Sequence, residues 1–427
     1  MIRSLLILIL VTAVAWGARS FSPTGHVLGG TGASLGLGFL LIAGIQTGHI
    51  FHAARLPHLT GYLLCGLLFG PSVLGLLSHA MVNDLSLVRN VAVGLIALLA
   101  GCELNARVLR PQFRAIGLVT SVATFVAMAL IFGLFFYVTG QLPGTRALSD
   151  IQRIAVAAVA ATVLGAFSPS AVLGILAETK ADGPFARLSL STVVVNNLLI
   201  ALLFSLANTA AIGVIPGSAA VGGLATLAWQ ILMSLAIGAV VGGVLGIYIT
   251  RVGRRSGLVI FGVLFVVAES GVAVGLDPLL AGLAAGLFLE NVTPVSGKEV
   301  VRQTEAATLP TFVVFFGVVG AELHLQEFIA VAPWALVAAA IRALGIVAGV
   351  RWSWRAAGMD EETAGRMPNA FLPQAGIALA LAAIVENSFQ PWGLEVAALL
   401  LGVVVVNEIA GPIMFRQALI RAGEVRS

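Results

Sequence analysis

The polar side chains that could do chemistry in this sequence stand inside long apolar runs. Three of them are ionisable and lie well inside their runs: Glu269 in FGVLFVVAESGVAVGL, Arg342 in AAAIRALGIVAG and Glu408 in VVVVNEIAGP. Ionisable residues in apolar surroundings are costly and usually functional. We expect Glu408 or Glu269 to carry a proton, with Arg342 as the charge partner. The alternative is that the three form structural ion pairs.

A second, uncharged group of residues could bind a cation through oxygen. The group consists of Thr162, Ser168, Asn196, Asn197 and Gln374. Amide and hydroxyl oxygens can coordinate Na⁺ or K⁺, but an amide cannot release a proton near neutral pH. We therefore predict a neutral cation or substrate site from these residues and nearby backbone carbonyls, and a separate acid for the proton.

The composition indicates whether these residues are surrounded by water or by lipid. Of 427 residues, 59% are hydrophobic and 10% are charged, and the mean hydropathy is +1.05. A soluble domain is about one quarter charged, so this chain belongs in a lipid bilayer. The continuously apolar runs exclude an outer-membrane barrel, whose strands alternate apolar and polar residues.

Thirteen apolar runs are long enough to predict helices in the membrane. They cover 34–53, 59–78, 86–103, 115–138, 154–177, 189–212, 220–250, 257–276, 278–290, 309–322, 329–350, 369–386 and 394–416. The runs at 278–290 and 309–322 are short, so we expect their helices to extend into the flanking residues. The run at 4–17 predicts either a signal peptide over residues 1–19 or an extra N-terminal helix.

The positions of the basic residues predict the orientation in the membrane. Seventeen of the 23 Lys and Arg residues fall in alternate loops, at the end of the last run or in the tail at 419–427, and four fall on the opposite side. Cytoplasmic loops collect Lys and Arg, so the C-terminus is predicted to be cytoplasmic in a bacterial-type inner membrane. The net charge of +4 lies mostly in these short loops, so no nucleic-acid partner is expected.

Two of the predicted helices contain a proline at comparable places. Pro169 interrupts AATVLGAFSPSAVLGIL, with a break expected from Phe167 to Ser170, and Pro373 interrupts NAFLPQAGIALALA. Proline removes a backbone donor and clashes with the preceding helical turn. Paired interruptions in the two halves of a chain are typical of secondary transporters built from inverted repeats.

Several stretches resemble the monovalent cation:proton antiporter family, in particular its Kef-like cation:proton antiporter-2 branch. They include LPHLTGYLLCGLLFGPSVLGLL, SPSAVLGILAETKADGPFARLSLSTVVVNNLLIALLF and ESGVAVGLDPLLAGLAAGLFLENVTP, and the resemblance covers residues 34–418. The resemblance implies an all-α fold of thirteen spans with two crossed, broken helices. It also implies a core domain at about 115–212 and 329–418, a dimer domain formed by the other helices, and a homodimer.

The chain departs from the family's pattern at the sixth span. Family members usually have Asp-Asp or Asn-Asp there, and this sequence has Asn196 and Asn197. One carboxylate shared by cation and proton therefore cannot act at the usual position. Our leading interpretation is exchange of Na⁺ or K⁺ for protons. The alternatives are an anion or organic-acid carrier on the same fold, and a transport-inactive sensor or assembly subunit.

No pattern indicates an enzyme, a cofactor or a metal centre. There is no glycine-rich phosphate loop after a strand and no Ser/His/Asp set, and Cys65 and Cys102 have no metal-ligand spacing. His49 and His52 are three residues apart, with His58 following in a loop. We interpret these histidines as interfacial side chains; metal binding or pH sensing are the other interpretations.

Overall fold

The computed structural model describes residues 2–20, 32–54, 56–142, 144–215, 224–252, 256–274, 276–322, 325–374, 376–389 and 392–425. The regular elements of these residues are all helices, because a helix satisfies its own backbone hydrogen bonds in lipid. Residues 220–223 of a predicted run, residues 275 and 375 of two others, and the last two residues of the predicted tail lie outside the described residues.

The chain forms two compact units, and each unit is built from two separate stretches of sequence. Unit 1 comprises Met1–Val108 and Gln230–Leu325, and unit 2 comprises Leu109–Trp229 and Gln326–Ser427. Of the predicted site residues, only Glu269 belongs to unit 1. The rest of the predicted site is therefore confined to unit 2.

Unit 1 consists of helices from both halves of the sequence. They are α1 (Ile2–Ser20), α2 (Ala33–Ala53), α3 (His58–Phe69), α4 (His79–Asp84), α5 (Ser86–Glu103), α6 (Ala106–Leu109), most of α11 (Leu224–Arg251), α12 (Ser256–Val274), α13 (Pro278–Val292) and α14 (Gly297–Glu322). The segment predicted as a signal peptide or an extra helix is α1, which packs on α2 with Ala15 buried.

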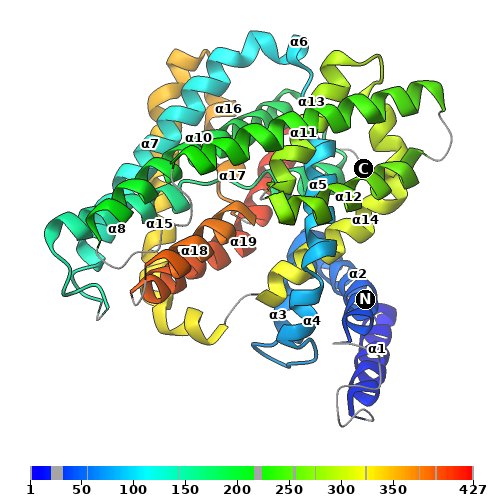
Figure 1. Cartoon of the computed structure of the whole chain (residues 1–427), viewed down its shortest axis with the longest axis horizontal. Coiled ribbons are helices and arrows are strands. Elements are labelled where there is room, and N and C mark those ends of the chain that lie inside the picture. The colour runs from blue at the N-terminus through cyan, green and yellow to red at the C-terminus, as the bar shows by residue number, and fades with distance from the viewer. Residues whose placement is uncertain are drawn as a thin grey trace. The chain divides into compact units, whose positions relative to one another are not determined.

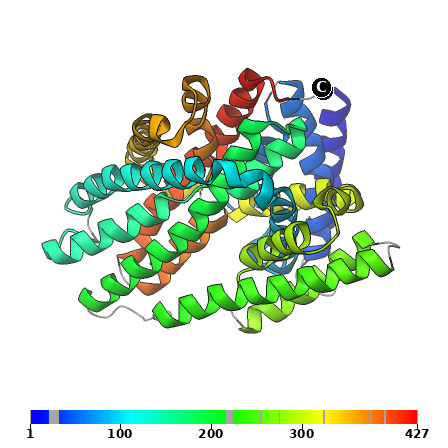
Figure 2. The same cartoon turned by 90° about the horizontal axis from the view of Figure 1, so that it is seen from above.

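Unit 2 contains the remaining helices. They are the short 3-10 helix Arg110–Gln112, α7 (Phe113–Val138), α8 (Asp150–Leu164), α9 (Pro169–Thr179), α10 (Pro184–Val214), α15 (Leu325–Ala357), α16 (Glu361–Arg366), α17 (Pro368–Phe371), α18 (Gly376–Ser388) and α19 (Gly393–Ala422). Helices α7, α8 and α10 lie side by side, and α18 and α19 pack against α8 (Figures 1 and 2).

Each predicted run contains a helix, although the lengths differ from the prediction. Helix α14 begins at Gly297 and so extends its short run as expected, whereas α3 ends at Phe69 because Gly70 and Pro71 follow. By length and composition, seven described helices could cross a membrane, or eight if the bent pair Gly297–Thr304 and Ala307–Glu322 is one span. The chain is therefore a multi-pass membrane protein, and the count of thirteen spans stays a prediction.

Glycines let the helices of unit 1 pack backbone against backbone. A Cβ atom at Gly242 of α11 would lie 2.5 Å from the carbonyl oxygen of Ala285 in α13. Gly66 meets the backbone of α14 and Gly286 meets the backbone of α5 in the same way. Small residues allow such close approach in membranes. These glycines thus serve packing inside one chain.

Two adjacent glycines of α11 test this packing. Gly242→Ala is expected to destabilise the protein by about 1–3 kcal/mol, because the new methyl group overlaps α13. Gly243→Ala is the matched control, because its Cβ atom would meet only a Phe288 ring carbon at 3.5 Å. Thermal unfolding in detergent should show a lower midpoint for the first variant alone. Equal midpoints for the two variants would contradict this account of the packing.

Candidate functional site

The first interruption lies between α8 and α9. Helix α8 ends at Leu164, residues 165–168 are not helical, and α9 begins at Pro169. Pro169 occupies the first helical position, where its missing N–H costs nothing. The Ser168 hydroxyl accepts a hydrogen bond from the Ala171 N–H at 3.2 Å and so caps α9. The break therefore lies slightly earlier than the predicted Phe167–Ser170.

The second interruption touches the first. Helix α17 ends at Phe371, and residues 372–374 precede α18. The Ser168 N–H donates to the Pro373 carbonyl at 3.0 Å, and the rings of Phe167 and Phe371 stack with centroids 4.7 Å apart. The two breaks meet as a pair, as the resemblance implies for crossed, broken helices.

Arg342 of α15 holds this crossing together. Its guanidinium is fully buried and donates to the carbonyl oxygens of Leu164 (2.7 Å), Ala166 (2.9 Å), Phe371 (2.9 Å) and Leu372 (3.0 Å). These carbonyls lie at the C-terminal ends of α8 and α17, where the helix dipoles are negative. Four backbone carbonyls thus surround the positive charge.

The partners of Arg342 among the described residues are backbone carbonyls and not the predicted acid. None of their ion pairs includes Arg342 or Glu408. The carbonyls freed by the two prolines already provide negative partial charge for the guanidinium. The alternative that Glu269, Arg342 and Glu408 form structural ion pairs is not supported either.

Gln374 also belongs to the framework of the crossing. Its Nε2 donates to the Leu164 and Ala166 carbonyls at 3.1 Å each, and its Oε1 accepts from Asn407 Nδ2 at 2.8 Å. Each of these two carbonyls therefore accepts one bond from Gln374 and one from Arg342. A carbonyl oxygen has two lone pairs, so neither carbonyl is open to a cation.

Asn196 fastens α10 to the first break. Its Oδ1 accepts from the Phe167 N–H at 2.9 Å, and its Nδ2 donates to Thr124 Oγ1 at 2.8 Å and to the Gly165 carbonyl at 3.2 Å. Thr124 lies in α7, and its sequence surroundings gave no signal of this contact. The only oxygen of the Asn196 side chain is already engaged.

Thr162 and Ser168 make short-range hydrogen bonds. The Thr162 hydroxyl donates to the Val159 carbonyl at 2.7 Å, and the Ser168 and Ser170 hydroxyls are 3.1 Å apart. Together with Asn196 and Gln374, these residues shape the break. Asn197 is the predicted cation ligand whose side-chain atoms all remain without a partner.

Three buried side chains among the described residues of unit 2 have no hydrogen-bond partner for any of their polar atoms. They are Ser388 of α18, which is 1% exposed, and Asn197 of α10 and Glu408 of α19, each 2% exposed. Leaving a buried amide unpaired is costly, and leaving a buried carboxylate unpaired costs far more. A proton, an ion or a buried water molecule could provide the missing partner for these side chains.

Glu269 has a different environment. It lies in α12 of unit 1, and its side chain is exposed. It therefore differs from Arg342, Asn197 and Glu408, which are buried in unit 2.

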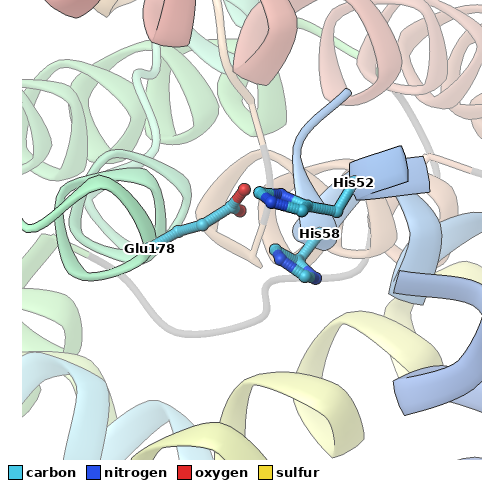
Figure 3. Close-up of side chains that lie close together, drawn as sticks. All are labelled: His52, His58 and Glu178. Atoms are coloured by element: carbon cyan, nitrogen blue, oxygen red, sulfur yellow. The ribbon is translucent and has the colours of Figure 1, made fainter. Parts of the chain in front are cut away.

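The histidines form a ring contact in unit 1. His52 near the end of α2 and His58 at the start of α3 stack with centroids 4.4 Å apart and an interplanar angle of 17° (Figure 3). His49 meets His58 edge-on at 5.9 Å. The ring contacts thus join His49 and His52 of α2 to His58, which begins α3 and does not lie in a loop as predicted.

Comparisons with known proteins identify the family of this chain. Residues 37–421 match the family model "Sodium/hydrogen exchanger, transmembrane". The chain also resembles the sodium proton antiporter MjNhaP1 of Methanocaldococcus jannaschii at pH 8, with 16% identity and a TM-score of 0.68, over 92% of this chain and 98% of that one. An electron-microscopy structure of the same antiporter gives 15% identity and a TM-score of 0.70 with the same coverage. No curated protein sequence matches significantly.

The structural similarity, at this identity, supports the fold. The family match extends over most of the chain, including both interrupted helices and the helices that carry Arg342, Asn197 and Glu408. The chain therefore belongs to the sodium/hydrogen exchanger family of membrane proteins.

Proposed function

We propose that this protein exchanges a monovalent cation, Na⁺ or K⁺, for protons across a bacterial-type inner membrane, and that Glu408 carries the proton. The observation that supports this proposal most is the enclosed Glu408 carboxyl group without a partner. A lone carboxylate is too costly in a dry interior, so a proton or a cation must accompany Glu408 whenever it is enclosed. Alternate loading by the two is the chemistry of an exchanger.

The buried residues around the crossing have a supporting role in this proposal. Arg342, Gln374 and Asn196 fix the ends of the broken helices, and their polar atoms are engaged in hydrogen bonds. Four of the five N–H donors of Arg342 already bond to carbonyls, so the guanidinium has little capacity left for an anion. This arrangement favours a cation substrate over an anion or organic acid.

The two units suggest how the transporter is organised. We assign the ion site to unit 2 and the contact between two copies to unit 1, following the core and dimer domains that the resemblance implies. On the same basis we assign the chain to the Kef-like branch and place the C-terminus in the cytoplasm. Glu408, rather than the exposed Glu269, is the proton carrier in this assignment.

Proteoliposomes with a trapped pH dye test the proposed function. Addition of NaCl or KCl should change the internal pH, and the rate should saturate with cation concentration. Choline chloride is the control, because its cation is too large for a site between packed helices. Flux of an anion without a cation response would favour the anion carrier, and no response to either would favour a transport-inactive protein. Either result would overturn the proposal.

A further inference from the structure

Glu408 and Asn197 are both buried and unpaired, and they come from different helices. We propose that they form one composite site between α10 and α19, occupied in turn by a dehydrated monovalent cation and by a proton, exchanged one for one. The inference rests on the proposed function and adds the cation's ligand, its charge class and the stoichiometry. In this arrangement, the acid of the site is on α19 and its neutral ligand is on α10.

The ends of the two helices establish that α10 and α19 run in opposite directions. The carboxylate of Glu424, just after α19, accepts hydrogen bonds from the N–H groups of Phe185 and Ala186 at the start of α10, both at 2.8 Å. The rings of Phe185 and Phe415 lie 6.2 Å apart. The beginning of α10 therefore lies beside the end of α19.

A shared apolar cluster then sets the level of the two polar residues. Ile200 of α10 and Val404 of α19 belong to one buried cluster with Ala166 and Ala378. Asn197 lies three residues before Ile200, and Glu408 lies four residues after Val404. Residues three or four apart share one face of a helix, one turn apart. Because the helices are antiparallel, the step from Ile200 back to Asn197 and the step from Val404 forward to Glu408 go in the same direction. The two side chains therefore come to the same level on facing surfaces of α10 and α19.

The donor atoms of this pair suit a monovalent cation. Glu408 supplies carboxylate oxygens and Asn197 supplies an amide oxygen, and none of these atoms has a partner in the protein. Oxygen donors are the ligands that hard cations prefer. Both side chains are only 2% exposed, so a bound cation would lose most of its water and depend on these oxygens.

The buried charges determine the stoichiometry. Arg342 and Glu408 are the only buried side chains of charged type among the described residues, so their charges sum to zero before loading. Other charged residues on helices packed against α19 are exposed or half-buried: Asp150, Arg153, Glu178, Arg187 and Glu386, and those of α16. A proton and a monovalent cation each raise the buried charge to +1, whereas a divalent cation would raise it to +2. The two loaded forms are electrically equivalent only for one-for-one exchange of a monovalent cation.

Calorimetric titration of the purified full chain with NaCl, KCl and CaCl₂ tests the site. Glu408→Gln should weaken Na⁺ or K⁺ binding by at least about 100-fold and Asn197→Ala by about 10-fold, the range expected for contacts to a charged group. Calcium should not compete. Asn208→Ala is the matched control, because Asn208 is equally buried on the same helix, about three turns away.

The exchanged variant Asn197→Asp/Glu408→Gln tests the facing arrangement directly. It restores one carboxylate and one amide, so binding should return to within about 10-fold of the original. Unchanged cation binding in Glu408→Gln would overturn the composite site, as would a double variant that keeps its melting temperature and still binds as weakly as Glu408→Gln. Either outcome is compatible with proton-coupled flux by the original protein, so it would overturn the composite site alone. Absence of flux in the original protein would overturn the proposed function itself.

Discussion

Replacing Arg342 with leucine is expected to destabilise the protein by about 3–5 kcal/mol, because it breaks a buried network of hydrogen bonds from a charged group to backbone carbonyls. The change removes one donor from each of four buried carbonyls at the ends of α8 and α17, and the Leu164 and Ala166 carbonyls keep the donor that Gln374 provides. Arg342→Lys should recover only part of this loss, because an ammonium has three donors and lacks the planar fork of a guanidinium. Thermal unfolding in detergent, followed by tryptophan fluorescence, measures both effects.

Arg351→Leu provides the matched control for this prediction. Arg351 lies on the same helix, α15, and is exposed. The same substitution there should leave the unfolding midpoint nearly unchanged, since surface replacements usually change stability by less than about 0.5 kcal/mol. If Arg342→Leu melted at the same temperature as the Arg351→Leu variant, Arg342 would not hold the crossing together.

Replacing Glu408 with glutamine is expected to abolish proton-coupled exchange while preserving the fold. The glutamine has nearly the same shape, but it cannot release a proton near neutral pH. The exchange rate in proteoliposomes should fall at least about 100-fold, in line with the loss of contacts to a charged group. The melting temperature should stay equal or rise, because an amide costs less to bury unpaired than a carboxylate does.

Glu269→Gln makes the same chemical change at the exposed acid of unit 1 and should retain exchange. This combination of a stable fold and lost transport would separate Glu408 from a structural role. Loss of exchange in Glu269→Gln, with exchange kept in Glu408→Gln, would move the proton site to α12. A lower melting temperature for Glu408→Gln would show that the carboxyl group has a structural partner.

The sequence predicts the interrupted helices well because proline acts locally. Pro169 and Pro373 each stand at or beside a break, wherever the rest of the chain lies. The apolar runs predict the helices for the same reason: a segment in lipid must satisfy its own backbone hydrogen bonds. The lengths are less predictable, as the early end of α3 shows, because they depend on single residues such as Pro71.

The sequence could not show which polar groups remain unpaired. Asn196 and Asn197 are neighbours of the same type, yet the first bonds to Thr124 and to the break while the second has no partner. That difference depends on which face of α10 meets α7 and α8. The hydrogen-bond partners of Arg342 could not be predicted either, because they are backbone carbonyls, which every residue possesses.

The depth of an acid in an apolar run was also an incomplete guide. Glu269 and Glu408 both lie within long apolar runs, but only Glu408 is enclosed by its unit. Position along a helix predicts depth in the membrane, whereas position around the helix decides between enclosure and exposure. The second property becomes known only when the neighbouring helices are in place.

The most direct test of the account counts the protons released when the cation binds. Calorimetric titration of the purified protein with NaCl or KCl, repeated in buffers of different ionisation enthalpy, gives this number at each pH. We predict a release that approaches one proton per cation on the acidic side of the titration and vanishes in Glu408→Gln. Cation binding without proton release at any pH, or equal release by the original protein and Glu408→Gln, would contradict it.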